Sequence, residues 1–346
     1  MPQISVLMPA YNAEKYIEQA INSILNQTFK DFELIIVNDG STDKTHQLIS
    51  SFIDTRIKYY QNEGNKGLAF VRNRLIQLAN CPFVAFLDSD DIAEPNRLEV
   101  EYNFLKNQDD LDFISSSVVV QTDDGKQNLD ALKFDCNSSE LKINLLFFNP
   151  IVTSTVMFKK AILPTEIFRE DYPPCEDYDL WVRMLLKKKG KILPTYLAIY
   201  RSYNTSVSHR KEKEARENRN KIIVNQLEYY FPNQFSKEEE QVHLSLVEFS
   251  LKNNIDDLPE LQKWITKLLA LNATFQHFDD AILKQVLYER ILKKLLRLKQ
   301  YNSAVYKTLR QFKKQLQPTI SLELRKKEIA IFVFSFLHKQ IISLSN

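Results

Sequence analysis

Short apolar runs alternate with segments of helical periodicity through the first half of the chain. Apolar runs bounded by turn residues are typical of buried strands, and apolar residues three and four apart are typical of amphipathic helices. We predict strands at Ile4–Met8, Phe32–Val37, Ile57–Gln61, Phe83–Leu87 and around Phe113–Gln121. The predicted helices lie between them, at Ala13–Leu25, Asp43–Phe52, Leu68–Ala79 and Pro95–Lys106. This alternation indicates an α/β fold with a mainly parallel central sheet covered on both faces.

The pattern changes in the second half. A short amphipathic helix is predicted at Leu180–Leu186, and the charge-dense stretch His209–Lys221 predicts an exposed helix. From Gln241 onward, Leu, Ile and Phe recur at helical spacing with almost no Gly. We therefore predict an α/β domain over residues 1–214 and an α-helical C-terminal domain over residues 215–346.

Composition and cysteine usage indicate a folded cytoplasmic protein. The 346 residues are 44% hydrophobic and 26% charged, which favours neither a disordered nor a membrane-embedded chain. Cys81, Cys136 and Cys175 are odd in number and lack CxxC spacing, which argues against a disulfide framework and a zinc cluster. The start of the sequence lacks the features of a secretory signal, and the late apolar run Ile329–Leu337 is too short to span a bilayer.

Charge is distributed unevenly along the chain. Residues 289–346 hold thirteen Lys or Arg and three Glu, a net +10, so residues 1–288 carry +2 minus +10, or −8. One hypothesis is peripheral contact with an anionic membrane at its inner face, with Leu and Phe against the bilayer. The cations that would meet the lipids are Lys293, Lys294, Arg297, Lys313, Lys314, Lys326 and Lys327. The alternative is that the same apolar stripe forms a homo-oligomer interface or an ordinary domain core.

Polar residues follow three of the predicted strands at the point where each strand ends. These segments are Pro9–Asn12, Asn38–Ser41 and Asp88–Asp91, and two of the three contain carboxylates. In mainly parallel sheets, ligands bind beyond the carboxyl ends of the strands. We therefore expect a binding site at this edge of the sheet.

Asp88-Ser89-Asp90 places two carboxylates on the same side of an extended backbone, because side chains alternate along a strand. Such a pair suits Mg²⁺ or Mn²⁺ shared with a diphosphate. The alternative is an acidic turn of purely structural importance, since such turns are common after strands. The position directly after a buried apolar run favours the functional interpretation.

Two other groups fit a nucleotide. Asp39, at a strand end before Gly40, offers an acceptor for the imide N–H of uracil, and the Tyr11 ring offers a stacking surface. Arg72, near a predicted helix start, could pair with phosphate or carboxylate, although an Arg on a helix is commonly only solvated.

Glu176 and Asp177 precede the predicted helix at Leu180–Leu186. Acidic residues at a helix N-terminus oppose its dipole favourably, and this structural role could explain them. The functional interpretation makes one of them a general base that removes a proton from an acceptor hydroxyl, ionised at neutral pH without an elevated pKa.

In sequence order, these segments resemble those of the family 2 inverting glycosyltransferases, which have the GT-A fold. The motifs that carry the resemblance are SVLMPAYNAEKYIEQAINSILNQTF, FELIIVNDGSTDKT, NKGLAFVRN, FVAFLDSDD, EDYDLWVRM and YRSYNTSVS. They cover about residues 3–209, so the resemblance makes residues 1–214 a GT-A catalytic domain. It implies transfer of a sugar from a nucleotide-sugar, most often a UDP-sugar, to a hydroxyl of a glycan or lipid-linked acceptor in cell-surface polysaccharide synthesis. No nucleic-acid partner is expected.

The resemblance also implies roles for individual residues in nucleotide binding. Pro9, Tyr11 and Asp39 match positions that hold the nucleobase, while Asn65 and Arg72 match nucleotide contacts. Asp39 fits UDP or dTDP, because both bases carry the imide N–H.

Metal binding and catalysis are implied at two further motifs. Asp88, Ser89 and Asp90 match the metal-binding motif, with Asp90 as the better direct ligand for Mn²⁺ or Mg²⁺. Asp177 matches the catalytic base, and Glu176 matches its neighbour in the acceptor site. The implied mechanism is a single in-line displacement that inverts the anomeric configuration.

Three other positions are weaker candidates. Glu14 and Arg201 match residues that shape the donor pocket in the family, and His209 is either an extra metal ligand or a surface residue beside Arg210. Leu180-Trp181-Val182-Arg183 follows the base and no Gln-x-x-Arg-Trp motif is present, unlike the processive synthases of the family.

Two other functions are disfavoured by the sequence. Another nucleotide-binding α/β enzyme, such as a dehydrogenase or a nucleotidyltransferase, would need a glycine-rich phosphate loop after the first strand, where this chain has Pro9–Asn12 and only 5 Gly in total. A catalytically inactive GT-A subunit, acting as a partner or carbohydrate-binding protein, would have lost the acidic motifs, yet Asp39, Asp88, Asp90 and Asp177 are all present.

Overall fold

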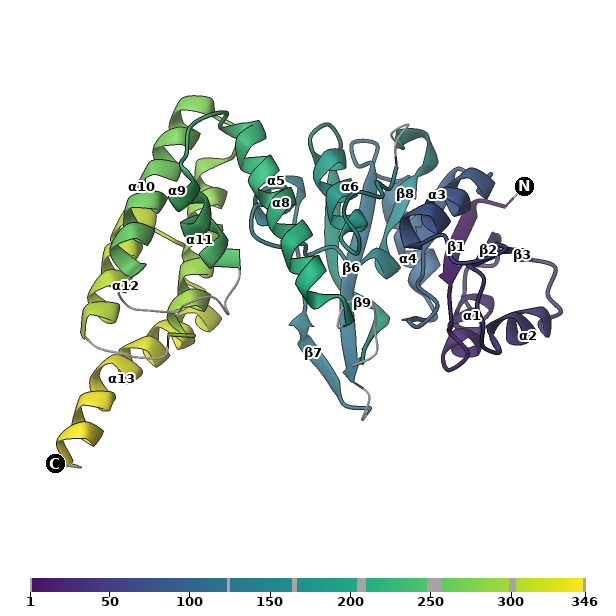
Figure 1. Cartoon of the computed structure of the whole chain (residues 1–346), viewed down its shortest axis with the longest axis horizontal. Coiled ribbons are helices and arrows are strands. Elements are labelled where there is room, and N and C mark those ends of the chain that lie inside the picture. The colour runs from purple at the N-terminus through teal and green to yellow at the C-terminus, as the bar shows by residue number, and fades with distance from the viewer. Residues whose placement is uncertain are drawn as a thin grey trace. The chain divides into compact units, whose positions relative to one another are not determined.

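The computed structural model describes residues 2–122, 125–163, 167–203, 210–247, 257–298 and 303–344. The chain divides into two compact units (Figure 1). The sheet unit comprises Met1–Lys142 and Asn149–Ile222, and the helical unit comprises Ile143–Phe148 and Ile223–Asn346. The division falls inside helix α8 (Glu212–Tyr230), later in the chain than residue 214, and the helical unit includes a short piece from the middle of the sequence.

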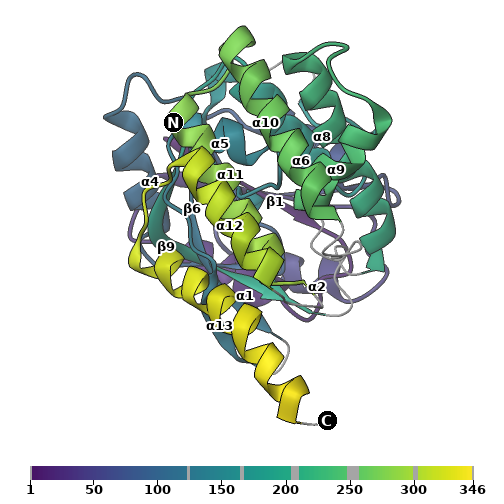
Figure 2. The same ribbon diagram turned by 90° about the vertical axis from the view of Figure 1, so that its left-hand side faces the viewer.

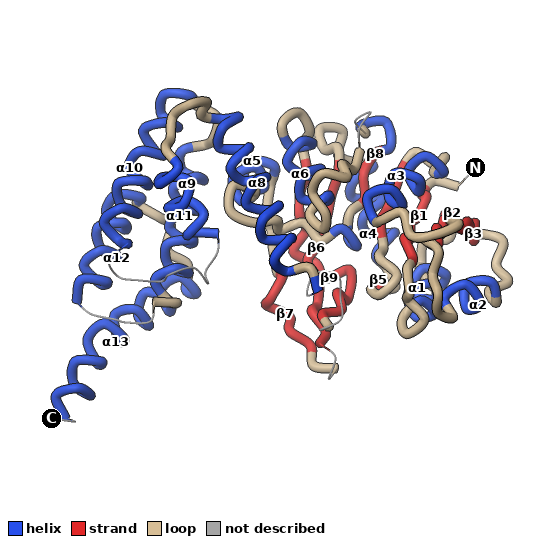
Figure 3. The backbone as a smooth tube through the Cα atoms, viewed as in Figure 1, coloured by secondary structure: helices blue, strands red, loops and turns tan. Residues whose placement is uncertain are grey.

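One mixed sheet forms the centre of the sheet unit (Figure 3). Its strands are β1 (Ile4–Ala10), β2 (Phe32–Asn38), β3 (Ile57–Gln61), β4 (Phe83–Phe86), β5 (Ile92–Ala93), β6 (Phe113–Thr122), β7 (Gln127–Leu132), β8 (Met157–Lys159) and β9 (Gly190–Ser202). The order is β3-β2-β1-β4-β8-β6-β9-β5, and β7 pairs with β6. Strands β3, β2, β1 and β4 run parallel, as do β6 and β9, whereas β8 is antiparallel to both neighbours. The predicted α/β class is confirmed.

Helices follow most of the strands of the sheet unit. They are α1 (Ile17–Leu25), α2 (Thr45–Ser50), α3 (Leu68–Leu78), α4 (Arg97–Lys106), α5 (Ser138–Asn144) and α6 (Glu176–Leu185), with two short 3₁₀ helices, η1 (Thr153–Thr155) and η2 (Lys160–Ile162). The predicted helices agree with α1 to α4 within a few residues at each end. Helix α6 begins at Glu176 rather than at Leu180, because the acidic residues of its first turn stabilise the positive end of the helix dipole.

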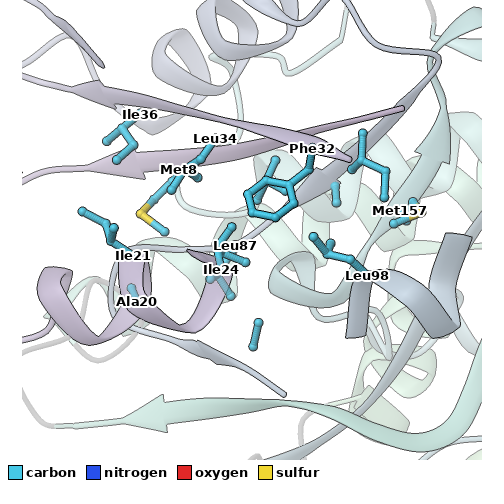
Figure 4. Close-up of a cluster of buried hydrophobic side chains, with 14 of the residues drawn as sticks. Met8, Ala20, Ile21, Ile24, Phe32, Leu34, Ile36, Leu87, Leu98 and Met157 are labelled. Carbon is cyan, nitrogen blue, oxygen red and sulfur yellow. The ribbon is translucent and has the colours of Figure 1, made fainter. Parts of the chain in front are cut away.

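Strand β1 illustrates why the sheet is covered on both faces. Alternate residues of a strand point to opposite faces, and Ile4, Val6 and Met8 all belong to the apolar cluster that includes Ile21 and Leu34 (Figure 4). The other face of β1 and β2 is covered by α3. Burial on both faces explains why these strands are continuous apolar runs rather than alternating ones.

Strand β9 was missed because Pro194 interrupts its sequence pattern. Proline removes a backbone donor, so it is confined to strand edges and irregular positions. The pairing of β9 with β6 shifts register between Ser116 and Ser117, where Leu193 and Tyr196 are the successive partners. The irregularity accommodates the proline, and the strand continues to the edge where the strand-end motifs lie.

The helical unit consists of the end of α8 and five further helices in the described chain (Figure 2). These are α9 (Lys237–Val247), α10 (Leu258–Phe275), α11 (Asp280–Leu295), α12 (Ser303–Leu316) and α13 (Leu322–Leu344). Asp279 caps α11 by accepting a hydrogen bond from the Ile282 N–H, at 2.9 Å. None of the helices formed by described residues is both long and apolar enough to cross a bilayer.

Ile143–Phe148 lies within the helical unit and is held there by a buried histidine. His243 bonds the Leu146 carbonyl oxygen through Nε2 at 2.8 Å and accepts from Trp264 Nε1 through Nδ1 at 3.2 Å. A neutral imidazole has one donor and one acceptor nitrogen, so Nε2 carries the proton. The ring also stacks on Phe147, with centroids 4.9 Å apart. Burial lowers the pKa of His243 to about 4, so this arrangement contains the neutral ring.

Part of the cationic surface expected at the C-terminal end is absent. Lys294 is buried, and its Nζ donates to the Ser245 carbonyl oxygen at 3.4 Å. Lys293 is only partly exposed, and burial lowers the pKa of both lysines. The prediction that Lys294 meets lipid headgroups is therefore wrong, because this residue lies on the part of α11 that packs inside its unit.

Candidate active site

Three strand ends meet at one edge of the sheet, as the sequence predicted. In the parallel register, Ala10 is the partner of Asn38, and Leu7 is the partner of Phe86. Neighbouring strands are about 4.8 Å apart, so β2 and β4, which flank β1, lie roughly 10 Å from each other across the sheet. The loops after β1, β2 and β4 therefore form one surface.

Asp39 orders the neighbouring loop. Its buried carboxylate accepts hydrogen bonds from Asn62 Nδ2 at 2.6 Å and from the backbone N–H groups of Lys66 and Gly67 at 3.0 and 2.9 Å. The Lys66 N–H lies between the two carboxylate oxygens, so each oxygen accepts two hydrogen bonds. Gly40 follows at φ 69°, and a Cβ there would lie 2.5 Å from the Gly64 Cα, so only glycine fits.

The other residues with expected nucleotide roles lie around this loop. Pro9 is buried in β1 opposite Val37, whereas the Tyr11 side chain is 45% exposed and Asn65 is exposed. Glu14 accepts a hydrogen bond from the Lys44 N–H at 3.0 Å, which links the loop after β1 to the start of α2. The exposed Tyr11 ring is available for stacking.

Arg72 joins two of the acidic motifs. Its guanidinium is 4% exposed and contacts Glu176 Oε1 through Nη1 at 2.8 Å and Asp88 Oδ1 through Nη2 at 3.1 Å. The negative charges of Asp88, Glu176 and Asp177 raise the pKa of Arg72, which remains protonated although it is buried. The pKa of Glu176 is raised by burial to about 7 in spite of this cation. Residues far apart in the sequence thus surround one buried guanidinium.

Asp177 is held by a hydroxyl and by its own helix. Its Oδ2 accepts from Thr153 Oγ1 at 3.0 Å and from Asn149 Nδ2 at 3.4 Å, while Oδ1 accepts from the Tyr178 N–H at 2.7 Å. Burial raises the pKa of Asp177 above its ordinary value, against the opposing effects of Arg72 and Thr153. The expectation that its pKa needs no elevation thus differs from the structure, because the carboxyl group is more buried than a helix N-terminus implies.

The segment Asp88–Asp91 is fixed from both sides. Ser154 accepts from the Asp88 N–H at 3.0 Å and donates to Asp91 Oδ2. Arg201 binds the same segment, because its backbone N–H donates to Asp91 at 2.9 Å and its Nη1 donates to the Asp90 carbonyl oxygen at 2.7 Å. Ser89 is partly exposed between the two carboxylates. Arg201 therefore shapes this loop through contacts to its backbone.

Asp90 is the carboxylate of this segment that remains most open to a cation. Asp88 is paired with Arg72. Among the contacts of the described residues, Asp90 Oδ2 accepts only one hydrogen bond, from the Tyr203 hydroxyl at 2.7 Å. Burial and the charge of Asp88 raise the pKa of Asp90. A divalent cation would relieve this repulsion, so the donor set fits Mg²⁺ or Mn²⁺.

No cluster of three or more His, Cys, Asp or Glu side chains suited to a metal occurs among the described residues. A cation held by one or two carboxylates needs its remaining ligands from water and substrate phosphate, the usual situation for Mg²⁺. His209, the other candidate ligand, lies outside the described residues.

Four residues of this site were not predicted from the sequence. Thr153, Ser154 and Asn149 precede β8, and Tyr203 follows β9. The consecutive hydroxyl residues Thr153-Ser154-Thr155, located between two apolar runs, were a usable signal, because buried hydroxyl groups require partners. Tyr203 belonged to a motif that was recognised, but no role was assigned to it.

The family model for glycosyl transferase family 2 matches residues 5–170. An uncharacterised glycosyltransferase of Haemophilus influenzae is 32% identical over 240 residues, which cover 66% of this chain and 74% of that protein. The Escherichia coli protein UDP-Glc:alpha-D-GlcNAc-diphosphoundecaprenol beta-1,3-glucosyltransferase WfgD is 33% identical over 214 residues, covering 61% of this chain and 81% of its own.

The fold is also similar to solved structures. The crystal structure of S. aureus TarS 1-349 in complex with UDP-GlcNAc matches with a TM-score of 0.56 and 21% identity, over 91% of each chain. At this identity the similarity concerns the fold. The matched family model and the relatives show that the chain belongs to glycosyltransferase family 2 and is a glycosyltransferase.

Proposed function

We propose that this enzyme transfers a sugar from a UDP-sugar to a hydroxyl of a glycan or lipid-linked acceptor, with inversion and with a divalent cation. The observation that carries the proposal is the position of Arg72, which contacts Asp88 at 3.1 Å and Glu176 at 2.8 Å. Through this contact, the proposed base Asp177, next to Glu176 in α6, lies close to the segment proposed to hold the diphosphate and its cation.

The proposed nucleotide site is formed by the loops after β1 and β2. The Asp39 carboxylate at the end of β2 is the proposed acceptor for the imide N–H of uracil, and Tyr11 provides an exposed ring for stacking. Asn65 lies in the loop that Asp39 orders, and Pro9 ends the strand that leads to Tyr11. These contacts favour UDP or dTDP over nucleotides whose base lacks this N–H.

Asp90 would hold the proposed cation, with Asp88 as the second protein carboxylate. When bound, it supplies Lewis-acid stabilisation of the negative charge that develops on the departing diphosphate. Tyr203 orients Asp90 through its hydroxyl, and Arg201 holds the backbone of this segment. Arg72 forms an ion pair with Asp88 and adds positive charge beside the proposed diphosphate.

The chemical step uses Asp177 as general base. The acceptor hydroxyl gives its proton to the Asp177 carboxylate, and its oxygen forms a bond to the anomeric carbon. The bond from that carbon to the diphosphate oxygen breaks, and its electron pair leaves with the nucleoside diphosphate. Asp177 is suited to this role because its raised pKa makes it a stronger base than an exposed aspartate. Attack opposite to the leaving group inverts the configuration.

The acceptor class is proposed from the relatives. The Escherichia coli glucosyltransferase named above acts on a diphosphoundecaprenol-linked sugar by its name, and the Escherichia coli protein WbnJ, 33% identical over 188 residues, is named an O-antigen biosynthesis glycosyltransferase. We infer an acceptor of this chemical class for this enzyme, in cell-surface polysaccharide synthesis on the cytoplasmic side of the membrane.

The proposal is tested in two steps. UDP-sugars are first ranked by thermal stabilisation of the protein in the presence of Mn²⁺, because a ligand of the native state raises its apparent stability. UDP release with the best donor is then measured for the wild type, Asp177→Asn and the control Asp171→Asn, which changes an exposed acid. Loss of a general base lowers kcat by about 10²–10⁴-fold.

The outcomes separate this proposal from an inactive subunit. Loss of turnover in Asp177→Asn with unchanged donor binding, and full activity in Asp171→Asn, support it. Donor binding without turnover for any acceptor fraction in the wild type would instead favour a carbohydrate-binding subunit. Equal activity of the two variants would exclude Asp177 as the base.

A further inference from the structure

Helix α13 has apolar side chains on two opposite sides. Successive residues of an α-helix are rotated by about 100°, so Leu322 and Ile329 share one side while Leu324 and Ile331 share the opposite one. Leu324 and Ile331 are buried in the helical unit, at 6% and 0% exposure, whereas Leu322 and Ile329 are 71% and 54% exposed. The buried side accounts for the packing of α13. The exposed side has no such explanation.

The exposed side of α13 is continuous with one side of α12. The rings of Tyr306 in α12 and Phe332 in α13 lie 5.0 Å apart between centroids, and Phe332 remains 45% exposed. Figures 1 and 2 both show α13 beside α12, with the C-terminal part of α13 extending beyond the neighbouring helices of the unit. The apolar surface is therefore formed mainly by α13, and the half-buried Tyr306 of α12 borders it.

Basic side chains surround this surface. Arg325 and Lys326 lie within about 60° of Leu322 around the axis of α13. A groove along α12 is lined by Tyr306 and by further cations. The exposed basic residues of the two helices without an ion pair among the described residues are Lys307, Arg310, Lys314, Arg325 and Lys326. By contrast, Lys313 and Lys327 are paired with glutamates of α13.

The charge of this surface distinguishes between two kinds of partner, a second copy of the chain and a lipid bilayer. Residues 303–335 contain seven Lys or Arg and two Glu, a net +5. A second copy docking through the same face in a two-fold dimer would bring two surfaces of this charge together, and protein interfaces are depleted of charge at their centre. An anionic bilayer matches both features, because cations meet the headgroups while apolar side chains enter the acyl boundary.

We propose that α12 and α13 form a peripheral docking surface for an anionic lipid bilayer. Leu322, Ile329 and Phe332 enter the interface, and the five unpaired cations contact lipid phosphates. The docking rests on these two helices alone and requires no transfer chemistry. Its relevance to the enzyme rests on the proposed function, since a lipid-linked acceptor is confined to the membrane surface where this contact would hold the protein.

Flotation of the full chain with lipid vesicles tests the proposal. Vesicles of phosphatidylcholine with phosphatidylglycerol are compared with vesicles of phosphatidylcholine alone, at low and high salt. The charge variant combines Lys307→Glu, Arg310→Glu and Lys326→Glu. Its matched control makes the same change of charge at three exposed lysines elsewhere, Lys30→Glu, Lys189→Glu and Lys263→Glu.

We expect the wild type and the control to float only with anionic vesicles, and less in high salt. Each cation near such a surface contributes about fivefold to partitioning, so the charge variant should bind on the order of 100-fold more weakly. A second variant, Leu322→Ser with Ile329→Ser, changes only exposed residues and should also lose binding while it keeps its unfolding temperature.

Three results would overturn the proposal. They are equal flotation with neutral and anionic vesicles, equal loss in the charge variant and its control, and a dimer in sedimentation velocity that the Leu322→Ser and Ile329→Ser variant dissociates. The last result would assign the surface to a second copy of the chain. Flotation is measured without donor or acceptor, so failure of the membrane contact and failure of the transfer mechanism are distinguishable.

Discussion

Thr153 and Ser154 are adjacent in the chain, yet their hydroxyls bind two different acidic segments of the site. Thr153 donates to Asp177 at 3.0 Å, while Ser154 accepts from the Asp88 N–H at 3.0 Å and donates to Asp91. The 3₁₀ helix η1 thereby sets the distance between the proposed base and the proposed cation segment. Arg72 connects the same two segments by charge.

Removal of Arg72 should destabilise the protein. Breaking a buried ion pair by removing one partner leaves an uncompensated charge and costs about 3–5 kcal/mol, so Arg72→Met should lower the free energy of unfolding by about 3 kcal/mol. Urea unfolding measures this, with Arg210→Met as an exposed control that should change by less than about 0.5 kcal/mol. Because Glu176→Gln removes the partner charge, the double variant should be less destabilised than the sum of the single variants. If the losses of stability in the two single variants simply add in the double variant, the contact between Arg72 and Glu176 is contradicted.

The Thr153 hydroxyl should affect the pH dependence of catalysis. Its hydrogen bond stabilises the ionised form of Asp177, and burial raises the pKa of that carboxyl group. The base must be ionised, so activity falls as the pH falls through this pKa, and Thr153→Val should move the acid limb of kcat/KM to higher pH. UDP release measured from pH 5 to 8 checks this, with Thr266→Val, on the exposed side of α10, as a control. If the acid limb of Thr153→Val lies at the same pH as that of the wild type, the Thr153 hydroxyl does not influence the catalytic base.

Tyr203 should influence the requirement for a divalent cation. Its hydroxyl donates to Asp90 at 2.7 Å and favours the ionised carboxylate. Loss of a group that orients a metal ligand typically weakens metal binding about 10–100-fold. Tyr203→Phe should therefore need a higher Mn²⁺ concentration for half-maximal activity, with little change in the maximum. The same Mn²⁺ requirement in wild type and variant would argue against Asp90 as the ligand.

The helical unit should lose stability in mild acid because of His243. Its pKa is lowered by burial from 6.5 to about 4, so the unfolded chain binds a proton first as the pH falls. The stability from the neutral ring is complete above pH 6.5 and is lost as the pH falls toward 4. From pH 7 to pH 5 we expect a loss of about 2 kcal/mol from this residue. Urea unfolding of the wild type and His243→Gln checks this, since the variant should show a smaller pH dependence. Equal slopes would exclude His243 as the source.

Sequence patterns predicted the strands of the parallel half because each is buried on both faces, as Ile4–Ala10 and Phe32–Asn38 illustrate. Since parallel strands end at a common edge, the position of Asp39 and Asp88 at the same edge of the sheet followed from topology. The ion pair between Arg72 and Glu176 could not be predicted from topology. Glu176 reaches it from a helix more than one hundred residues away, and only the folded chain shows that contact.

Other features were not predicted because local sequence patterns conflict with the fold. Pro194 argues against a strand, yet β9 continues through it at a register shift. Lys294 was assigned to the surface from its charge, whereas its position on the packed side of α11 buries it. The apolar segment Ile143–Phe148 contains no signal that it belongs to the helical unit, since its partners are distant in sequence.

The insertion of Ile143–Phe148 into the helical unit has a practical consequence for cutting and recombining this protein. A fragment that begins at residue 223 would lack the segment against which His243 is placed, and a fragment that ends at residue 222 would expose Phe147 to water. We expect neither fragment to adopt the structure that the same residues have in the full chain. A chimaera that exchanges the C-terminal region with that of a relative should therefore transplant the six-residue piece together with it.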